Sequence, residues 1–270
     1  MSHAHDNSTV SPIARAFVEA RRAGRSVKDY PGPEPVSLEA AYTVQDGAIS
    51  AWPDRVAGWK LGRINAPHDT RFGAGRLAGP IFAHNISTAG LTPTAFPVID
   101  GGFAAVEAEY VLEMAEDAPD REGWTAETVA PLVGRVLTGV EIAGSPFAGI
   151  NDHGPAVTAS DFGNNAGLIV GSEVADWRTR LTDLTCTMTI DGVIVGQGGA
   201  ASIPGGPLDS LAFLLNLLHR RGRRLEAGQL ISTGAATGVH DIRAGQRASA
   251  DFGPDGSIEC IAVPARERTV

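Results

Sequence analysis

Two glutamates, Glu107 and Glu109, lie inside the otherwise uncharged run 103–112. Read as a β-strand, this run places both carboxylates on one face, roughly 7 Å apart. Its other face carries no charge and is formed by Ala104, Val106, Ala108, Tyr110 and Leu112. Like charges this close oppose each other unless water or a cation compensates them. The pair is therefore either a solvated strand face or part of a cation site.

A third glutamate, Glu141, lies in a second strand-like run, 136–143, again among apolar residues. Hard divalent cations prefer oxygen ligands, and carboxylates are the strongest of these. Three carboxylates on neighbouring strands would suit such a cation.

A lysine stands out in an arginine-rich chain. Of the 22 basic residues only Lys28 and Lys60 are lysines, and Lys60 lies inside the segment 58–62. A buried lysine can change its protonation state, whereas an arginine stays charged. Lys60 is therefore a candidate for proton transfer, although chance alone would also explain it.

Composition narrows the class of protein. The chain has 270 residues, 43% of them hydrophobic and 20% charged, which is typical of a globular protein with a full core. The net charge of −9 argues against nucleic-acid binding, and no apolar run reaches the roughly 18 residues of a membrane span. The N-terminus lacks the features of a signal peptide, and Cys186 and Cys260 cannot form a disulfide framework. We expect a cytoplasmic protein.

The order of elements favours an α+β fold, because helices come first and strands dominate afterwards. We expect a helical part over 1–55 and a β core domain over 56–270. The patterns predict helices over 12–24, 37–52, 126–133 and 207–222, and strands over 56–62, 80–84, 103–112, 136–143, 184–190, 193–195, 230–234, 246–252 and 257–263. Residues 63–79 and 144–167 are predicted loops, and a loop as long as 144–167 is usually functional.

Several short motifs occur together in a characteristic order: Ala41-Tyr-Thr-Val-Gln45, Gly58-Trp-Lys-Leu-Gly62, Glu107-x-Glu109, Glu141-Ile142, Gly206-Pro-Leu208 and Ser232-Thr-Gly234. This order resembles the 2-keto-4-pentenoate hydratase and 4-oxalocrotonate decarboxylase family of the fumarylacetoacetate hydrolase superfamily. The resemblance covers nearly the whole chain. It implies a mixed β-sandwich or roll core of the fumarylacetoacetase C-terminal type, a small N-terminal helical part and a homo-oligomer.

The resemblance also implies a site. Mg²⁺ or Mn²⁺ would be held by Glu107, Glu109 and Glu141, with Lys60 beside a bound 2-oxo acid. The turn Ser232-Thr233-Gly234 matches a loop that contacts the substrate carboxylate. Three residues in neighbouring segments are further candidates for substrate binding: Arg63, Asp161 and Asn164.

The implied activity is that of a lyase of aromatic-compound catabolism, most simply the hydration of a 2-hydroxypenta-2,4-dienoate-type substrate to a 4-hydroxy-2-oxo acid. The cation would stabilise an enolate, and Lys60 would shuttle a proton if burial lowers its pKa. Two stretches depart from the family pattern. His84 stands where the hydratases typically carry an aspartate. The segment 160–165 reads Ser-Asp-Phe-Gly-Asn-Asn, where the family usually has Ala-Asp-Asn-Ala-Ser-Ser. We expect His84 to relay protons near neutral pH.

Other activities stay open at this point. The same site would serve decarboxylation of 4-oxalocrotonate or oxaloacetate, or C–C hydrolysis of an acylpyruvate, in which a His–Glu pair commonly activates water. A different class of function is a non-catalytic partner subunit that associates with a related hydratase or decarboxylase. Retention of the three glutamates together with Lys60 argues against that last interpretation.

Overall fold

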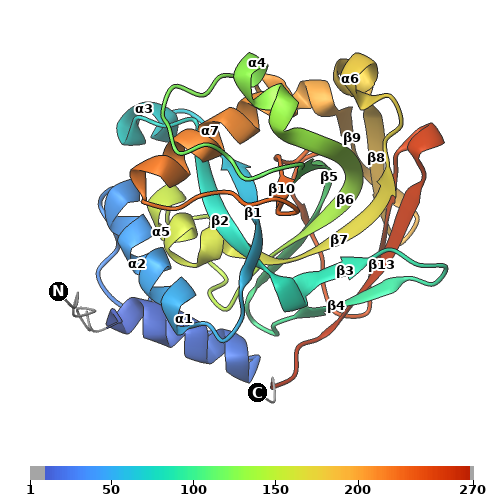
Figure 1. Cartoon of the computed structure of the whole chain (residues 1–270). Helices are drawn as coiled ribbons and strands as arrows, with labels where there is room; N and C mark the ends of the chain where they lie inside the picture. The colour runs from blue at the N-terminus through green and yellow to red at the C-terminus, as the bar shows by residue number, and fades with distance from the viewer. Residues whose placement is uncertain (1–9, 268–270) are drawn as a thin grey trace.

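Two β-sheets with helices around them form the chain, as seen in a computed structural model that describes residues 10–267 (Figure 1). Residues 1–9 and 268–270 of the two expected parts, 1–55 and 56–270, lie outside the described residues. The helices are α1 Pro12–Ala23, α2 Leu38–Ala51, α3 His68–Phe72, α4 Ala126–Val129, α5 Pro155–Ser160, α6 Trp177–Arg180 and α7 Gly206–Arg220. The strands are β1 Val56–Arg63, β2 Arg76–Phe82, β3 Ile86–Thr88, β4 Thr94–Val98, β5 Phe103–Met114, β6 Val133–Ser145, β7 Asn165–Glu173, β8 Thr185–Ile190, β9 Val193–Gly199, β10 Leu230–Ser232, β11 His240–Asp241, β12 Arg247–Asp251 and β13 Ser257–Pro264.

The two N-terminal helices begin and end where the sequence predicts. Ser11 Oγ accepts a hydrogen bond from the Ala14 N–H, and Gly24 ends α1 in a left-handed conformation with φ of 62°. Ser37 caps α2 in the same way. Gln45 joins α2 to the core because its buried amide donates to the carbonyl oxygens of Ala78 and Ala159.

The larger sheet curls around the centre of the molecule (Figure 1). Its strand order is β2-β1-β10-β5-β6-β7-β3, and β11 also pairs with β5. The sheet is mixed, since β1 pairs with β10 and β3 with β7 in parallel, while the other pairs are antiparallel. The long strands β5 and β6 lie in its middle.

The smaller sheet has the order β4-β13-β12-β8-β9 and completes a sandwich-like core. The uncharged face of β5 belongs to this core, where the Tyr110 ring meets the Phe252 ring with centroids 5.6 Å apart. Cys186 and Cys260 are buried free thiols in the same core. The predicted α+β class with a mixed β core and N-terminal helices is confirmed.

Some boundaries differ from the sequence-based predictions. The predicted loop 63–79 contains α3 and the first residues of β2, and the predicted loop 144–167 contains α5. Glycine and proline interrupt the alternation of β2, and α5 has six residues, too few for a helical period to be recognised. The predicted helix over 126–133 is α4 followed by a 3₁₀ turn, Ala130–Leu132.

The predicted hairpin is present, with Asp191 and Gly192 at φ of 49° and 79° in its turn. Among the described helices, none combines the length and the apolar character needed to cross a membrane.

Candidate metal centre and active site

Three glutamates meet in the middle of the large sheet. In the antiparallel pair β5–β6, Glu107 lies directly opposite Glu141, and Glu109 lies opposite Gly139. One carboxylate oxygen from each glutamate lies within 4.8 Å of those of the other two. The exposed fractions of Glu107, Glu109 and Glu141 are 4%, 0% and 0%. Because all three side chains are buried, the interpretation of a solvated strand face does not hold.

Hydrogen bonds orient two of these carboxylates. Glu109 Oε2 accepts from Ser232 Oγ at 2.6 Å and from the Gly234 N–H at 2.8 Å. Glu141 Oε1 accepts from Asn165 Nδ2 at 2.9 Å. Glu109 Oε1 is buried and accepts no hydrogen bond from any described residue, and the only partner of the buried Glu141 Oε2 in the described part of the chain is the Lys60 ammonium, 3.2 Å away. A buried acceptor without a donor is rare and costly, so Glu109 Oε1 in particular is suited to a cation.

The glutamates resist ionisation together. Burial raises the pKa of Glu107 to about 8, and the charge of Glu141 adds to this effect while Lys60 opposes it. Burial also raises the pKa of Glu109 well above its ordinary value, with further contributions from the charges of Glu141 and Glu107. A bound cation would remove the cost of ionising all three.

Lys60 is the only positive group in contact with the cluster among the described residues. Its Nζ lies 3.2 Å from Glu141 Oε2 and donates to Asn164 Oδ1 at 3.0 Å. Burial by itself lowers the pKa of Lys60, but the three glutamates outweigh it and raise the pKa above its ordinary value. The lower pKa expected for a buried lysine is therefore not found.

The charges of the cluster match a divalent cation. Three carboxylates and one ammonium sum to −2, which a Mg²⁺ or Mn²⁺ ion would cancel. The ligands are all oxygens, as both ions prefer, and Glu109 Oε1 accepts no hydrogen bond from residues 10–267. The donor set therefore fits such an ion.

A cavity of about 700 Å³ opens beside the cluster. Lys60, Glu107 and Asn164 line it, so the polar groups of the site are accessible from the cavity. Arg63 also lines it, is exposed, and has no hydrogen-bond or ion-pair partner among residues 10–267. Arg76 lines it too, but its guanidinium is bound to Asp209 at 2.9 Å.

Most of the predicted site residues come together here. Lys60, Arg63, Glu107, Asn164 and Thr233 line the cavity, and Glu109, Glu141 and Ser232 lie next to it. The hydroxyl groups of Ser232 and Thr233, expected to contact the substrate, instead donate hydrogen bonds within the protein. Ser232 Oγ donates to Glu109, and Thr233 Oγ1 donates to the Tyr110 carbonyl oxygen at 2.6 Å. Thr233 can therefore offer the cavity little more than its backbone and methyl group.

Two predicted site residues lie elsewhere, and these predictions are corrected. The His84 side chain is 82% exposed, forms an ion pair with Asp54 at 2.8 Å and does not line the cavity. Asp161 is buried, and its two carboxylate oxygens are held by Arg21 and Ser145. A carboxylate with both oxygens bound inside the protein cannot contact a substrate.

Two residues of the site were not predicted from the sequence: Asn165, which donates to Glu141, and Arg21, which pairs with Asp161. A third is Asn151, whose Oδ1 accepts from Asn164 Nδ2 at 3.0 Å and which lines the cavity. The available signal was Asn164 directly after Gly163, because both residue types tolerate the left-handed backbone that they adopt here.

No protein-family model matches the chain, but individual proteins do. The chain is 27% identical over 250 residues to a 4-oxalocrotonate decarboxylase from a Pseudomonas species, covering 87% of this chain and 91% of that protein. It is 25% identical over 263 residues to a 2-keto-4-pentenoate hydratase from Burkholderia vietnamiensis, covering 94% and 97%.

Solved structures share the fold. A 4-oxalocrotonate decarboxylase from Pseudomonas putida G7, complexed with magnesium and adipate, superposes with a TM-score of 0.80 at 21% identity, covering 97% of this chain and 100% of that chain. A fumarylpyruvate hydrolase from Pseudomonas aeruginosa, in complex with Mn²⁺ and pyruvate, has a TM-score of 0.57 at 16% identity, covering 79% and 91%.

These structures show that the chain has a fumarylacetoacetate hydrolase-like fold. Within it, the sequence relatives span nearly the whole chain. Over nearly its whole length the chain is similar, at 25–27% identity, to members of the 2-keto-4-pentenoate hydratase and 4-oxalocrotonate decarboxylase family, which agrees with the resemblance noted in the sequence.

Proposed function

We propose that this chain is a divalent-metal-dependent lyase that hydrates a 2-hydroxypenta-2,4-dienoate-type substrate to a 4-hydroxy-2-oxo acid. The observation that carries the proposal is the buried cluster of three glutamates beside Lys60, which opens into a cavity large enough for such a substrate. A relative that is a 2-keto-4-pentenoate hydratase supports the choice of reaction.

The residues that would hold Mg²⁺ or Mn²⁺ are Glu107, Glu109 and Glu141. When bound, the cation would supply Lewis-acid polarisation of the substrate's 2-oxygen. Ser232 donates a hydrogen bond to one oxygen of Glu109, and Asn165 donates one to an oxygen of Glu141. The second oxygen of each glutamate would then be the one that binds the cation.

Lys60 would transfer protons to and from the substrate. Hydration moves the proton of the 2-hydroxyl group to C5 and then adds water across C3 and C4, with the hydroxyl group at C4 and the proton at C3. Lys60 Nζ holds a proton at the wall of the cavity and is kept in place by Asn164. It is the group best placed to give a proton to the substrate and to take one back.

A second candidate is decarboxylation of a 4-oxalocrotonate-type dicarboxylate. Arg63 favours it, because an unpaired guanidinium in the cavity wall would bind a second carboxylate. The relatives include three 4-oxalocrotonate decarboxylases. Acylpyruvate hydrolysis loses its support, since the histidine invoked for it, His84, lies outside the cavity.

Proton NMR of 2-hydroxypenta-2,4-dienoate and of 4-oxalocrotonate, each with Mg²⁺ and with EDTA, tests both candidates. Metal-dependent formation of 4-hydroxy-2-oxopentanoate from the first substrate is expected for the hydratase. Metal-dependent loss of CO₂ from the second, without hydration of the first, would establish the decarboxylase. Inactivity toward both, in a protein that binds Mn²⁺, would refute the substrate class and revive the non-catalytic partner.

Assembly is also a proposal at this stage. We propose a homo-oligomer in solution, able to associate with a related hydratase or decarboxylase. Size-exclusion chromatography with light scattering would give the mass, and a mass of 28.0 kDa would contradict the homo-oligomer.

A further inference from the structure

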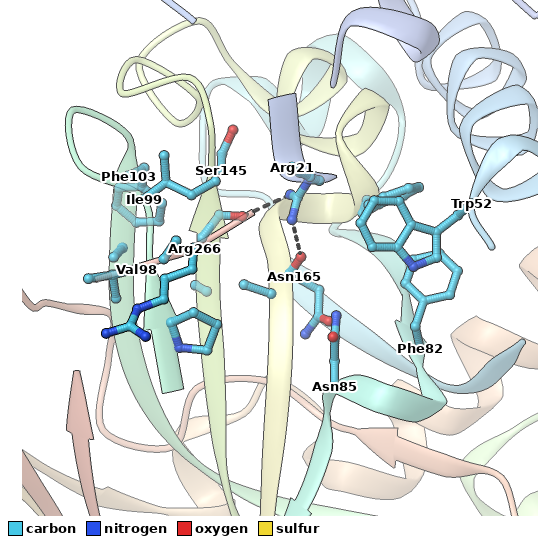
Figure 2. Close-up of a pocket in the computed structure, with 17 residues that line it drawn as sticks. Arg21, Trp52, Phe82, Asn85, Val98, Ile99, Phe103, Ser145, Asn165 and Arg266 are labelled. Atoms are coloured by element: carbon cyan, nitrogen blue, oxygen red, sulfur yellow. Dashed lines mark hydrogen bonds between the residues drawn. The ribbon is translucent and has the colours of Figure 1, made fainter. Parts of the chain in front are cut away.

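Helix α1 lies outside the cavity, yet its last turn reaches the residues behind the glutamate cluster. Arg21 Nε and Nη2 donate to the two carboxylate oxygens of Asp161 at 2.7 and 2.8 Å. Arg21 Nη1 and Nη2 donate to the carbonyl oxygens of Asn165 and Gly144, each at 2.9 Å, and Figure 2 shows the bond to Asn165. The two charged side chains are 8% and 0% exposed. A planar guanidinium held at so many points fixes the geometry of its partners.

The segment that follows Asp161 has an unusual backbone. Phe162, Gly163 and Asn164 have φ of 54°, 60° and 57°, so three consecutive residues are left-handed and two of them are not glycine. Such residues persist only where their surroundings hold them. One support is Gly79 of β2, where a Cβ atom would lie 1.9 Å from the Phe162 carbonyl oxygen. The other is Arg21, whose guanidinium carbon also lies 5.1 Å from the centre of the Phe162 ring.

The left-handed turn ends at Asn164, and Asn165 follows it in an extended conformation; both asparagines touch the active groups. Asn164 Oδ1 accepts from Lys60 Nζ, and Asn165 Nδ2 donates to Glu141 Oε1. Adjacent residues thus contact the ammonium and one carboxylate of the cluster. A shift of this turn would move both partners at once.

We propose that Arg21 and Asp161 are positioning residues, which hold the left-handed turn so that Asn164 aims Lys60 and Asn165 aims Glu141. Neither residue lines the main cavity, so their effect is exerted through the two asparagines. The inference deepens the proposed function and rests on it, because it assigns α1 a part in metal binding and proton transfer.

A second, smaller cavity makes the proposal testable by chemical rescue. It has a volume of about 170 Å³ and is bordered by Arg21, Trp52, Phe82 and Phe162 (Figure 2). Truncation of Arg21 would enlarge this cavity beside Asp161. A guanidinium ion added from solution can then enter and pair with the exposed carboxylate.

The experiment compares Arg21→Ala with Arg22→Ala, its neighbour on α1. Arg22 is exposed and has no hydrogen-bond or ion-pair partner in the described part of the chain. Mn²⁺ affinity is measured by electron paramagnetic resonance, and kcat and KM are measured with the substrate found by NMR. Each variant is assayed with and without guanidinium chloride at tens of millimolar, and with sodium chloride at the same concentration as a control.

In Arg21→Ala we expect the Mn²⁺ dissociation constant to rise about 10-fold or more, as for loss of other groups that orient metal ligands. We also expect kcat to fall more than KM rises. Guanidinium, but not sodium, restores both properties, and Arg22→Ala matches the wild-type protein. A merely structural pair would lower the thermal midpoint without changing the Mn²⁺ affinity or kcat of the folded protein.

If Arg21→Ala does not fold, Arg21→Lys is tested in its place. It keeps the positive charge but cannot donate two parallel hydrogen bonds to Asp161 as the guanidinium does. Wild-type Mn²⁺ affinity and kcat in a folded Arg21 variant would overturn the inference while the proposed function stands. Absence of Mn²⁺ binding by the wild-type protein would instead overturn the proposed function and this inference with it.

Discussion

Glu107 and Glu141 are direct partners across the antiparallel pair β5–β6, and both carboxylates are buried in one cluster with Glu109. Like charges directly opposite each other on one face of a sheet destabilise it. Only one ammonium, that of Lys60, lies against the three carboxylates within the described residues. The fold therefore contains a charge imbalance at its centre, and this imbalance couples the stability of the protein to pH and to divalent cations.

Without a cation, the protein should lose stability as pH rises. Burial raises the pKa of Glu107 from its ordinary value of 4.5 to about 8, and that of Glu109 also rises. Between pH 4.5 and about pH 8 the folded state binds more protons than the unfolded state, so the free energy of unfolding falls with increasing pH. Thermal unfolding in EDTA should therefore show a lower midpoint at pH 8 than at pH 5.5.

Mg²⁺ or Mn²⁺ should reverse this trend, because the cation binds only the ionised carboxylates. The rise in the midpoint on adding the metal should be larger at pH 8 than at pH 5.5. Calcium-free and magnesium-free samples prepared with EDTA provide the reference at each pH. A metal-induced shift that is absent, or is larger at the lower pH, would contradict the assignment of the cluster as a metal site.

Glu107→Gln should separate stability from activity. The change keeps the shape of the side chain and removes one of the opposed charges, so the metal-free variant at pH 8 should be more stable than the wild-type protein by about 1–2 kcal/mol. The same change removes a metal ligand, so most Mg²⁺-dependent activity should disappear. Urea unfolding in EDTA measures the first effect, and the NMR assay measures the second.

Glu116→Gln is a suitable control for this variant, because Glu116 follows β5 in the chain and is exposed. It should change neither the stability nor the activity by a measurable amount. Full activity of Glu107→Gln would refute the metal site.

The strand-by-strand placement of the three glutamates and Lys60 could be predicted from the sequence. The alternation of β5 assigned Glu107 and Glu109 to one face and Tyr110 to the core, and the structure has this arrangement. Alternation does not reveal what covers each face, however. Both faces of β5 are buried because separate clusters of side chains cover them, with Tyr110 in one and Val111 in another, and no local pattern encodes this arrangement.

The predictions for His84 and the segment 160–165 show why other parts of the site were not predictable. Close before the histidine in the chain, Phe82 is buried against Trp52 with ring centroids 5.5 Å apart, whereas the imidazole itself is exposed and ion-paired with Asp54. The left-handed turn and Asn165 after it are held by Arg21, from a helix about 140 residues earlier in the chain. Contacts so distant in sequence leave no periodic signal.

His84→Ala tests the correction for that residue. The imidazole is 82% exposed, so its ion pair with Asp54 is screened by water on that side, and we expect the stability to change by less than about 1 kcal/mol and the turnover by less than about twofold. Steady-state kinetics across pH 6 to 8 measures the second quantity. A large fall in kcat, or the loss of an ionisation from the pH profile, would show that His84 reaches the substrate after all.

Lys60→Met tests whether the ammonium transfers protons or only balances charge. Methionine has a similar length and no charge, so it should fill the same space among Leu61, Asn164 and the glutamates. Removal of a proton-transfer group typically lowers kcat by about 10²–10⁴-fold, and we expect a loss of this size. Mn²⁺ affinity should be retained or increased, since the cation would no longer compete with the ammonium for Glu141.

Lys28→Met is the matched control, because Lys28 is exposed and is the only other lysine of the chain. It should leave kcat and Mn²⁺ affinity unchanged. Loss of both properties in Lys60→Met would assign the ammonium to holding the cluster together, whereas loss of kcat with intact Mn²⁺ binding would assign it to the chemical step. Unchanged kcat would exclude Lys60 from catalysis and leave the three glutamates as the whole of the active centre.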